Sequence, residues 1–235
     1  MQTQDLAFVL HSRPYRETSA ILQCYSRQHG RIDGVLRGVY QQGRKGQQLR
    51  AAVQTGNQLE LEWRGREGLK TMVRCELLAA ARCATVRHLA CLAYVNELML
   101  HFLPAGQPAP ALFHDYSYLV QAMAIDRSPE RVLRLYEFAL LDELGCVPDF
   151  SWDSSRNAPL QAGRCYSIDP QRGVVDGAGD SLCLDAADLE ALAQRELASA
   201  RSLQIAKRVN RRLIDFQLAG RELKARALYR QLQQV

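Results

Sequence analysis

The side chains that could carry out catalysis are scattered along this sequence, whereas its cations are grouped. There is no GxxxxGK[ST] phosphate loop, no GxGxxG after a strand, no HExxH and no GxSxG element. The carboxylates cannot be paired across a cleft from the sequence. The histidines, which follow no metal-ligand spacing, are His11, His29, His88, His101 and His114. We therefore expect a binding protein with no catalytic residues, no metal and no cofactor.

The clearest candidate for binding chemistry is the basic segment RKGQQLR, residues 44–50, which we expect to form a glycine-containing loop. It holds Arg44, Lys45 and Arg50, and Tyr40 precedes it. Loops beside small β-barrels often form the groove for a single nucleic-acid strand, in which cations follow phosphates and aromatic rings stack on bases. Further candidates for the same surface are Arg13, Arg31, Arg37, Arg66, Lys70 and Arg74.

The distribution of charge also favours a polyanionic partner. Residues 1–80 contain 12 Lys and Arg against 7 Asp and Glu, and residues 201–235 contain 9 against 2. Residues 81–200 are acidic, with 9 against 16. A polyanion responds to clustered charge rather than to the average of +5. Basic faces that only contact solvent would give the same pattern.

The elements that must position these cations are short strands. Alternating polarity predicts strands at residues 6–11, 18–26, 31–39 and 59–64, and a fifth strand within 69–78. Five strands with glycine-bearing turns in about eighty residues fit an OB barrel, and an SH3-like barrel fits nearly as well. We expect an α+β protein with this β-barrel domain at residues 1–80.

After residue 80 the apolar period changes from two to 3.6, which predicts a helical domain over residues 81–235. Helices are expected near 87–103 and 112–125, and from Ser128 as N-cap to Gly145 as C-terminal cap. Residues 146–184 are irregular, with short strands near 165–168 and 173–175. Asp185 is expected to cap the next helix, and two basic helices follow.

The beginning of the sequence resembles no export signal, and no apolar run is long enough to span a membrane, so we expect a cytoplasmic, nucleoid-associated protein. Seven cysteines without a CxxC pair indicate reduced, buried or half-buried thiols rather than a disulfide framework.

Several ordered motifs give the sequence a family resemblance that covers nearly its whole length. They are AFVLHSRPYRETSAIL and HGRIDGVLRG in the β region, YVNELM and RLYEFALLDELG in the helical region, and AKRVNRRLI and GRELKARALYRQL near the end. Through these motifs the chain resembles the bacterial recombination mediators of the RecO family, most closely the gammaproteobacterial type.

The resemblance implies an N-terminal OB fold that binds single- and double-stranded DNA, and a mostly helical second domain. It implies strand annealing and, together with RecR, the loading of RecA onto single strands coated with single-stranded DNA-binding protein (SSB). It also implies docking of the acidic SSB tail, which ends in phenylalanine, on the helical domain. Our hypothesised tail pocket consists of Arg131, Arg134, Phe138, Lys207 and Arg211.

The chain departs from the family pattern in its cysteines. Many relatives bind zinc through two CxxC pairs in the irregular segment, whereas this sequence has isolated Cys146, Cys165 and Cys183 there. We therefore expect no structural zinc.

Two alternative functions stay open. The protein could be an adaptor that binds the SSB tail and has little affinity for DNA, or a nuclease whose site is assembled from carboxylates of the acidic middle region. No motif supports the nuclease.

Overall fold

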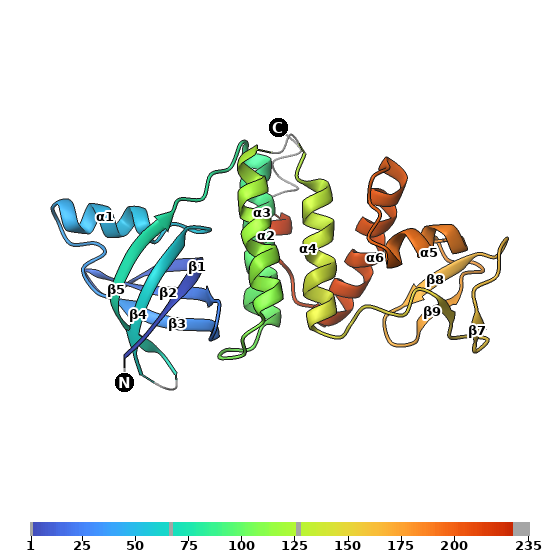
Figure 1. The fold of residues 1–235 in the computed structure, drawn as a ribbon, viewed down its shortest axis with the longest axis horizontal. Coiled ribbons are helices and arrows are strands. Elements are labelled where there is room, and N and C mark those ends of the chain that lie inside the picture. Colours follow the sequence, from blue (N-terminus) through green and yellow to red (C-terminus); the bar gives the residue numbers. More distant parts are fainter. Residues whose placement is uncertain (1, 66–67, 126–127, 228–235) are drawn as a thin grey trace. The chain divides into compact units, whose positions relative to one another are not determined.

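The computed structural model describes residues 2–65, 68–125 and 128–227 (Figure 1). The chain divides into two compact units: residues 1–127 together with 223–235, and residues 128–222. The first unit therefore contains the β region and also the two helices that follow it.

Five strands form a closed barrel in the first unit. They are β1 (Gln2–Tyr15), β2 (Ser19–Ser26), β3 (Gly30–Leu36), β4 (Gln58–Arg64) and β5 (Lys70–Ala79). Their order is β1-β2-β3-β5-β4, and β4 pairs with β1 to close the barrel. The β3–β5 pair is parallel and the other pairs are antiparallel. This order, with helix α1 (Arg44–Ala52) between β3 and β4, is that of an OB fold rather than an SH3-like barrel.

Alternating side chains fill the barrel as the sequence pattern predicts. In β4 the Leu59, Leu61 and Trp63 side chains are buried, whereas Glu60 and Glu62 are partly exposed. The side chains that meet them in the barrel interior include Ala20, Leu22 and Cys24 of β2. One face of each strand therefore contributes to a single apolar core.

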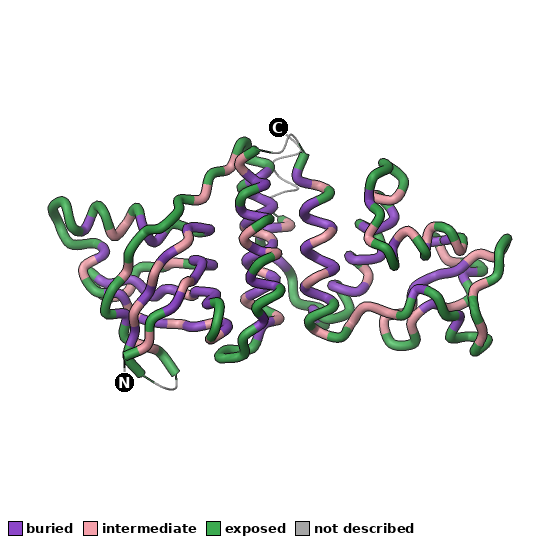
Figure 2. The backbone as a smooth tube through the Cα atoms, viewed as in Figure 1, coloured by how far each residue is buried: buried purple, intermediate pink, exposed green. Residues whose placement is uncertain are grey.

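Two helices of the first unit, α2 (Val86–Phe102) and α3 (Pro110–Ile125), cover part of the outer surface of the barrel. The hydroxyl of Tyr25 on β2 donates to the carbonyl of Ala109 at 2.9 Å, and the rings of Phe8 and Phe113 lie 5.1 Å apart. Both faces of β2 are consequently buried (Figure 2). Alternation alone could not show this, because it identifies the two faces of a strand but not what covers them.

A buried amide joins α2 to an irregularity in the barrel. The register of β1 against β2 shifts between Val9 and His11. The Asn96 side chain of α2 donates to the Leu10 carbonyl at 3.2 Å and accepts a hydrogen bond from the Tyr116 hydroxyl at 2.6 Å. The β-bulge thus directs a backbone carbonyl toward the helices, where Asn96 satisfies it.

The chain returns to the first unit after residue 222. The Glu97 carboxylate of α2 accepts the backbone N–H groups of Lys224 and Ala225, each at 2.9 Å. Residues 224–227 are helical, and the remainder of the predicted last helix lies outside the described residues. A carboxylate at a helix N-terminus is favourable because it meets unpaired N–H groups and the positive end of the helix dipole.

The second unit is built on α4 (Glu130–Glu143), α5 (Ala186–Ala193) and α6 (Ala200–Leu218). The predicted cap at Ser128 is wrong: Pro129 occupies the N-cap position, because its carbonyl accepts the first intrahelical bond, from Leu133. Gly145 follows Leu144, the C-cap residue of α4, and has a φ of 65°, as expected of a C-terminal glycine. The prediction that Asp185 caps α5 is confirmed by its reciprocal hydrogen bonds with Asp188.

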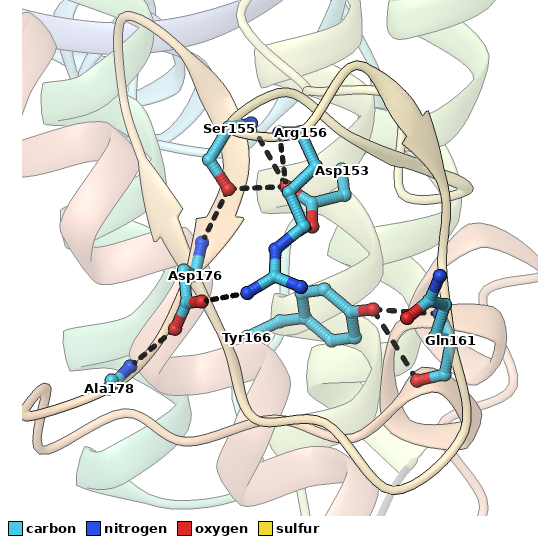
Figure 3. A network of polar contacts seen from close by, with 7 residues as sticks. All are labelled: Asp153, Ser155, Arg156, Gln161, Tyr166, Asp176 and Ala178. Atoms are coloured by element: carbon cyan, nitrogen blue, oxygen red, sulfur yellow. Dashed lines mark hydrogen bonds and ion pairs between the residues drawn. The ribbon is translucent and has the colours of Figure 1, made fainter.

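The irregular segment forms two small hairpins, β6 (Trp152–Asp153) with β7 (Ala158–Pro159), and β8 (Tyr166–Asp169) with β9 (Gly173–Asp176). The predicted strands near 165–168 and 173–175 correspond to β8 and β9. Aspartates fix the turns, since each accepts a backbone N–H group two residues further along. The five are Asp149, Asp153, Asp169, Asp176 and Asp180. Figure 3 shows how Arg156 links Asp153 and Asp176 of this network.

The Asp180 turn is attached to α6. The Arg212 guanidinium donates to both Asp180 carboxylate oxygens, at 2.8 and 3.0 Å, and also to the Ser167 hydroxyl. These bonds favour the ionised carboxylate, and Arg212 is the main reason that the pKa of Asp180 lies well below its usual range.

The expectation of reduced thiols is wrong for two of the seven cysteines. Cys165 and Cys183 form a disulfide, with Cα atoms 5.1 Å apart. An antiparallel bridge between Tyr166 and Leu184, the residues that follow the two cysteines, brings their segments together. The other cysteines are free thiols, of which Cys24 and Cys91 are buried.

Among residues 2–65, 68–125 and 128–227, no helix combines the length and apolarity needed to cross a bilayer. The same described residues contain no cluster of three or more potential metal ligands.

The carboxylates of the second unit predict its response to acid. The pKa values of Asp149, Asp169, Asp176, Asp180 and Asp188 are all lowered in the folded chain. The unfolded chain therefore binds protons first as pH falls, and we expect the contribution of these carboxylates to stability, which is complete near pH 7, to decline as pH falls below about 5. Unfolding by urea at pH 7, 4 and 3, followed by Trp152 fluorescence in a Trp63→Phe background, measures this.

Asp180→Asn should lower stability at pH 7 and flatten the decline. Glu196→Gln, an exposed carboxylate with no side-chain partner among the described residues, should leave the decline unchanged; an equal decline in Asp180→Asn would contradict the assignment.

Candidate nucleic-acid interface

The basic segment 44–50 is not a loop. After Gly43, whose φ is 92°, the chain enters α1 directly. Gly46 is buried, and a Cβ atom there would lie 1.9 Å from the Gln41 carbonyl oxygen. The glycine therefore permits close contact between the helix and the turn before it, which a sequence pattern cannot distinguish from loop flexibility.

Asn57 holds the far end of α1. Its side-chain amide donates to the Ala51 and Ala52 carbonyls at 2.8 and 2.9 Å, and its side-chain oxygen accepts the Ala81 backbone N–H at 2.8 Å. Its own carbonyl accepts the Val9 N–H at 3.0 Å. One buried residue thus joins α1, the barrel wall and the segment leading to α2.

Three segments meet at one end of the barrel and carry most of the predicted binding residues. They are the β1–β2 hairpin, the turn after β3, and α1. The Tyr40 backbone N–H donates to the Thr18 carbonyl at 2.9 Å, and the Arg50 guanidinium donates to the Val39 carbonyl at 3.1 Å. We call this surface the cationic rim. Its cations are Arg13, Arg16, Arg37, Arg44, Lys45 and Arg50.

The rim has a strong excess of positive charge. Its segments, residues 12–18 and 37–55, contain one carboxylate, Glu17, against the six cations. Arg44 and Lys45 occupy the first turn of α1, which has neither a capping side chain nor an acidic residue. Cations beside the positive end of a helix dipole repel it, so an anion bound there would be stabilised by both.

A shallow pocket of about 160 Å³ opens in the rim. Its lining consists of Ser12, Tyr40, Arg50, Val53, Gln54 and Thr55. Figure 2 shows that α1, which provides Arg50, is largely exposed.

The structure places the other predicted barrel residues elsewhere. Arg74 makes ion pairs with Glu62 at 3.3 Å and Glu76 at 2.6 Å on the barrel wall, so its charge is neutralised. Arg31 donates to the Leu100 carbonyl at 2.7 Å. Lys70 begins β5, where it pairs with Gly34 of β3, and Arg66 lies outside the described residues.

Sequence reasoning missed Arg16. It lies at the tip of the β1–β2 hairpin with a φ of 55°, and its guanidinium stacks 5.1 Å from the centroid of the Tyr15 ring. The signal that could have identified it is its position within PYRETS, between the first two strands.

The residues of the hypothesised tail pocket do not share one surface. Phe138 is fully buried, and its ring contacts the Arg195 guanidinium at 4.2 Å. Arg134 is buried and pairs with Glu137 at 2.7 Å, while Asn210 of α6 donates to both residues. The members that stay exposed are Arg131, Lys207 and Arg211, and Arg211 lies 3.5 Å from Asp215. Because Phe138 is buried, it cannot provide the apolar surface that was expected of the tail pocket.

The fold and the rim together define an OB-barrel protein with helical additions and a cationic surface. Two family models match nearly the whole chain: Recombination protein O N terminal over residues 1–81, and Recombination protein O C terminal over residues 84–227. The chain belongs to the RecO family.

Curated relatives agree along the full length. The DNA repair protein RecO of Marinobacter nauticus is 36% identical over 234 residues, covering 96% of this chain and 93% of the relative. That of Nitrosococcus oceani is 34% identical, covering 97% and 93%. That of Serratia proteamaculans is 33% identical, covering 98% and 95%.

Because α1 lies close to the turn before it, we expect a methyl group added at Gly46 to lower the stability of the first unit. Gly46→Ala should destabilise the first unit by about 1–3 kcal/mol, because the added Cβ overlaps a backbone carbonyl that cannot move without displacing the rim. Urea unfolding followed by Trp63 fluorescence in a Trp152→Phe background measures this. Gln47→Ala, at the neighbouring exposed position, is the control and should change stability by no more than about 0.5 kcal/mol. Equal stability of the two variants would show that the packing of α1 differs from that described.

The hydrogen bonds of Asn57 predict that its replacement also lowers the stability of the first unit. Asn57→Ala should destabilise the first unit by about 2–4 kcal/mol, since it leaves buried carbonyl and N–H groups without partners. The same fluorescence measurement applies. Gln54→Ala removes an exposed amide from the adjacent turn and should have little effect on stability. A loss below about 0.5 kcal/mol for Asn57→Ala would mean that water replaces the side chain.

Proposed function

We propose that this RecO-family protein is a recombinational DNA repair mediator that binds single- and double-stranded DNA through the cationic rim and anneals complementary strands. The observation that carries the proposal is the charge of the rim, with six cations against one carboxylate. The names of the relatives, DNA repair protein RecO, support the same process.

The rim suits a phosphate backbone because its cations are available. Arg13, Arg37, Arg44 and Lys45 are exposed, and they have no side-chain partner among the described residues. Lys and Arg side chains displace condensed counterions from DNA, so affinity falls with salt concentration and depends little on sequence. Binding of this kind also permits annealing, since cations placed near two strands reduce their mutual repulsion.

The proposal includes the protein partners of a mediator: RecR, with which the chain would load RecA onto SSB-coated single strands, and the SSB tail. The exposed cations of α6 support contact with an acidic tail. Lys207 and Arg211 lie one turn apart on its solvent-exposed side. The proposed tail contact therefore rests on Lys207, Arg211 and Arg131, rather than on the buried Arg134 and Phe138.

These cations also favour a second candidate function, an adaptor that binds SSB without binding DNA. DNA binding by the wild type separates the two, and Lys207→Glu tests the tail contact. It should weaken SSB-tail binding and leave DNA binding intact in a mediator, whereas in an adaptor the wild type would bind the tail and fail to bind DNA.

The decisive experiment compares two triple variants of equal charge. Arg37, Arg44 and Lys45 are replaced by Ala in the first. In the control, Arg27, Arg64 and Arg74 of the same barrel are replaced by Ala. The affinity for a labelled single strand is measured as a function of salt concentration, together with the rate of annealing of two complementary oligonucleotides, with and without SSB.

We expect the rim variant to lose annealing and to lower the slope of log affinity against log salt by about 2, which corresponds to three phosphate contacts with single-stranded DNA. The control should behave nearly like the wild type, because Arg74 is already paired with carboxylates. Arg27 follows the end of β2 and Arg64 pairs with Gln2 at the start of β1, so both lie at the ends of these strands opposite the β1–β2 hairpin. Equal losses in the two variants would show that only net charge matters and would overturn the assignment to the rim.

A further inference from the structure

The pocket in the cationic rim differs chemically from the rest of that surface. Five of its six lining residues are uncharged, and they provide one aromatic ring, one apolar side chain, two hydroxyls and one amide. A surface that only follows phosphates needs cations, not this combination. The pocket therefore indicates a ligand group that is flat, uncharged and able to form hydrogen bonds.

The backbone of Tyr40 is fixed by a hydrogen bond, whereas its side chain is partly exposed to solvent. The backbone N–H of Tyr40 donates to Thr18 at 2.9 Å, which fixes the turn to the β1–β2 hairpin. The side chain is 36% exposed and has no hydrogen-bond or ring partner among the described residues. Because the backbone is fixed and a tyrosine side chain has only two χ angles, the ring can stack on a ligand at a small cost in conformational entropy.

The Arg50 guanidinium is fixed beside the ring. It donates to the Val39 carbonyl at 3.1 Å and to the Gln41 carbonyl at 3.4 Å, the residues on either side of Tyr40. These two bonds orient the guanidinium toward the turn and use part of its donor capacity. A phosphate in the pocket would consequently meet a single cation that is already engaged. Outside the pocket, Arg37, Arg44 and Lys45 have no such partners among residues 2–65, 68–125 and 128–227.

The remaining lining can recognise the edge of a ring. Gln54 donates its amide to the Arg50 carbonyl at 2.8 Å, and the same bond leaves the Gln54 side-chain oxygen available as an acceptor. Ser12 and Thr55 provide hydroxyls that can donate or accept. Val53, which is buried, provides an apolar contact.

We propose that this pocket accepts one unstacked base of a single DNA strand, with the base stacked on Tyr40 and its edge facing Ser12, Gln54 and Thr55. The inference rests on the proposed function, in which the surrounding cations hold the phosphates on either side. A base in a duplex is paired and stacked on its neighbours, so it cannot enter the pocket without being extruded. The pocket therefore gives the rim a preference for single strands that its charge alone does not provide.

The test uses Tyr40→Ala, Tyr40→Phe and, as a matched control, Tyr118→Ala on α3, where the tyrosine is 55% exposed. Each full-length variant is titrated with a single-stranded oligonucleotide carrying a central 2-aminopurine, and with a blunt duplex of the same length, over a range of salt concentrations.

Tyr40→Ala should weaken single-strand binding by about 5-fold to 150-fold, the range for loss of one base–aromatic stack. Its duplex affinity and its salt dependence should stay at wild-type values, because no cation is removed. Wild-type protein should change the 2-aminopurine emission on binding, and Tyr40→Ala should not. Tyr40→Phe keeps the ring and should retain both properties, as should Tyr118→Ala.

Two results would overturn the pocket assignment: equal effects of Tyr40→Ala on single strands and duplex, or equal losses in Tyr40→Phe and Tyr40→Ala. Failure of the proposed function gives a different pattern, in which the triple variant of Arg37, Arg44 and Lys45 binds DNA with the wild-type salt dependence. The pocket can therefore be rejected while DNA binding by the rim stands.

Discussion

The attachment of α1 to the barrel is the constraint on which the candidate interface depends. Asn57 satisfies the last carbonyls of this helix and the first N–H of the segment leading to α2, and Gly46 lets the start of the helix contact the turn that carries Tyr40. These contacts are buried, so each unpaired group would carry a desolvation penalty of about 1–3 kcal/mol. The exposed cations of α1 do little to stabilise its position. Packing fixes the helix, and its solvent-facing residues are thereby free to bind a ligand.

The cations of the barrel differ in whether they are paired with other groups, as well as in where they lie. On the barrel wall, Arg74 lies between Glu62 and Glu76, while Arg31 is used to satisfy a helix carbonyl. At the rim, Arg37, Arg44 and Lys45 have no such partners within the described part of the chain. The field that a polyanion meets comes mainly from unpaired cations, since the two charges of an ion pair largely cancel at distances greater than their separation. A net charge of +5 for the chain therefore understates the attraction at one end of the barrel.

The acidic middle of the chain uses many of its carboxylates internally. Five aspartates fix turns of the irregular segment, and Asp180 also anchors Arg212 of α6. Together with the Cys165–Cys183 disulfide, these bonds give structure to a region that has few long strands or helices. This region therefore has less unpaired negative charge than its composition indicates. On α4 and α6, Arg134, Glu137 and Asn210 likewise bond to one another inside the packing.

The sequence by itself determined the barrel, the helical region, the family and most of the rim. Alternating polarity in segments such as LELEW fixes which faces are buried, and the spacing of apolar residues fixes the helices, because both signals are local. Tertiary structure alone decided that RKGQQLR is a helix, that Arg74 and Arg134 are neutralised, that Phe138 is buried and that Cys165 meets Cys183. Each of these depends on residues that are distant in the sequence or on backbone contacts such as that between Gly46 and Gln41. No local pattern encodes which side chain will lie within bonding distance of another, so the partner of a charge becomes visible only once the chain has folded.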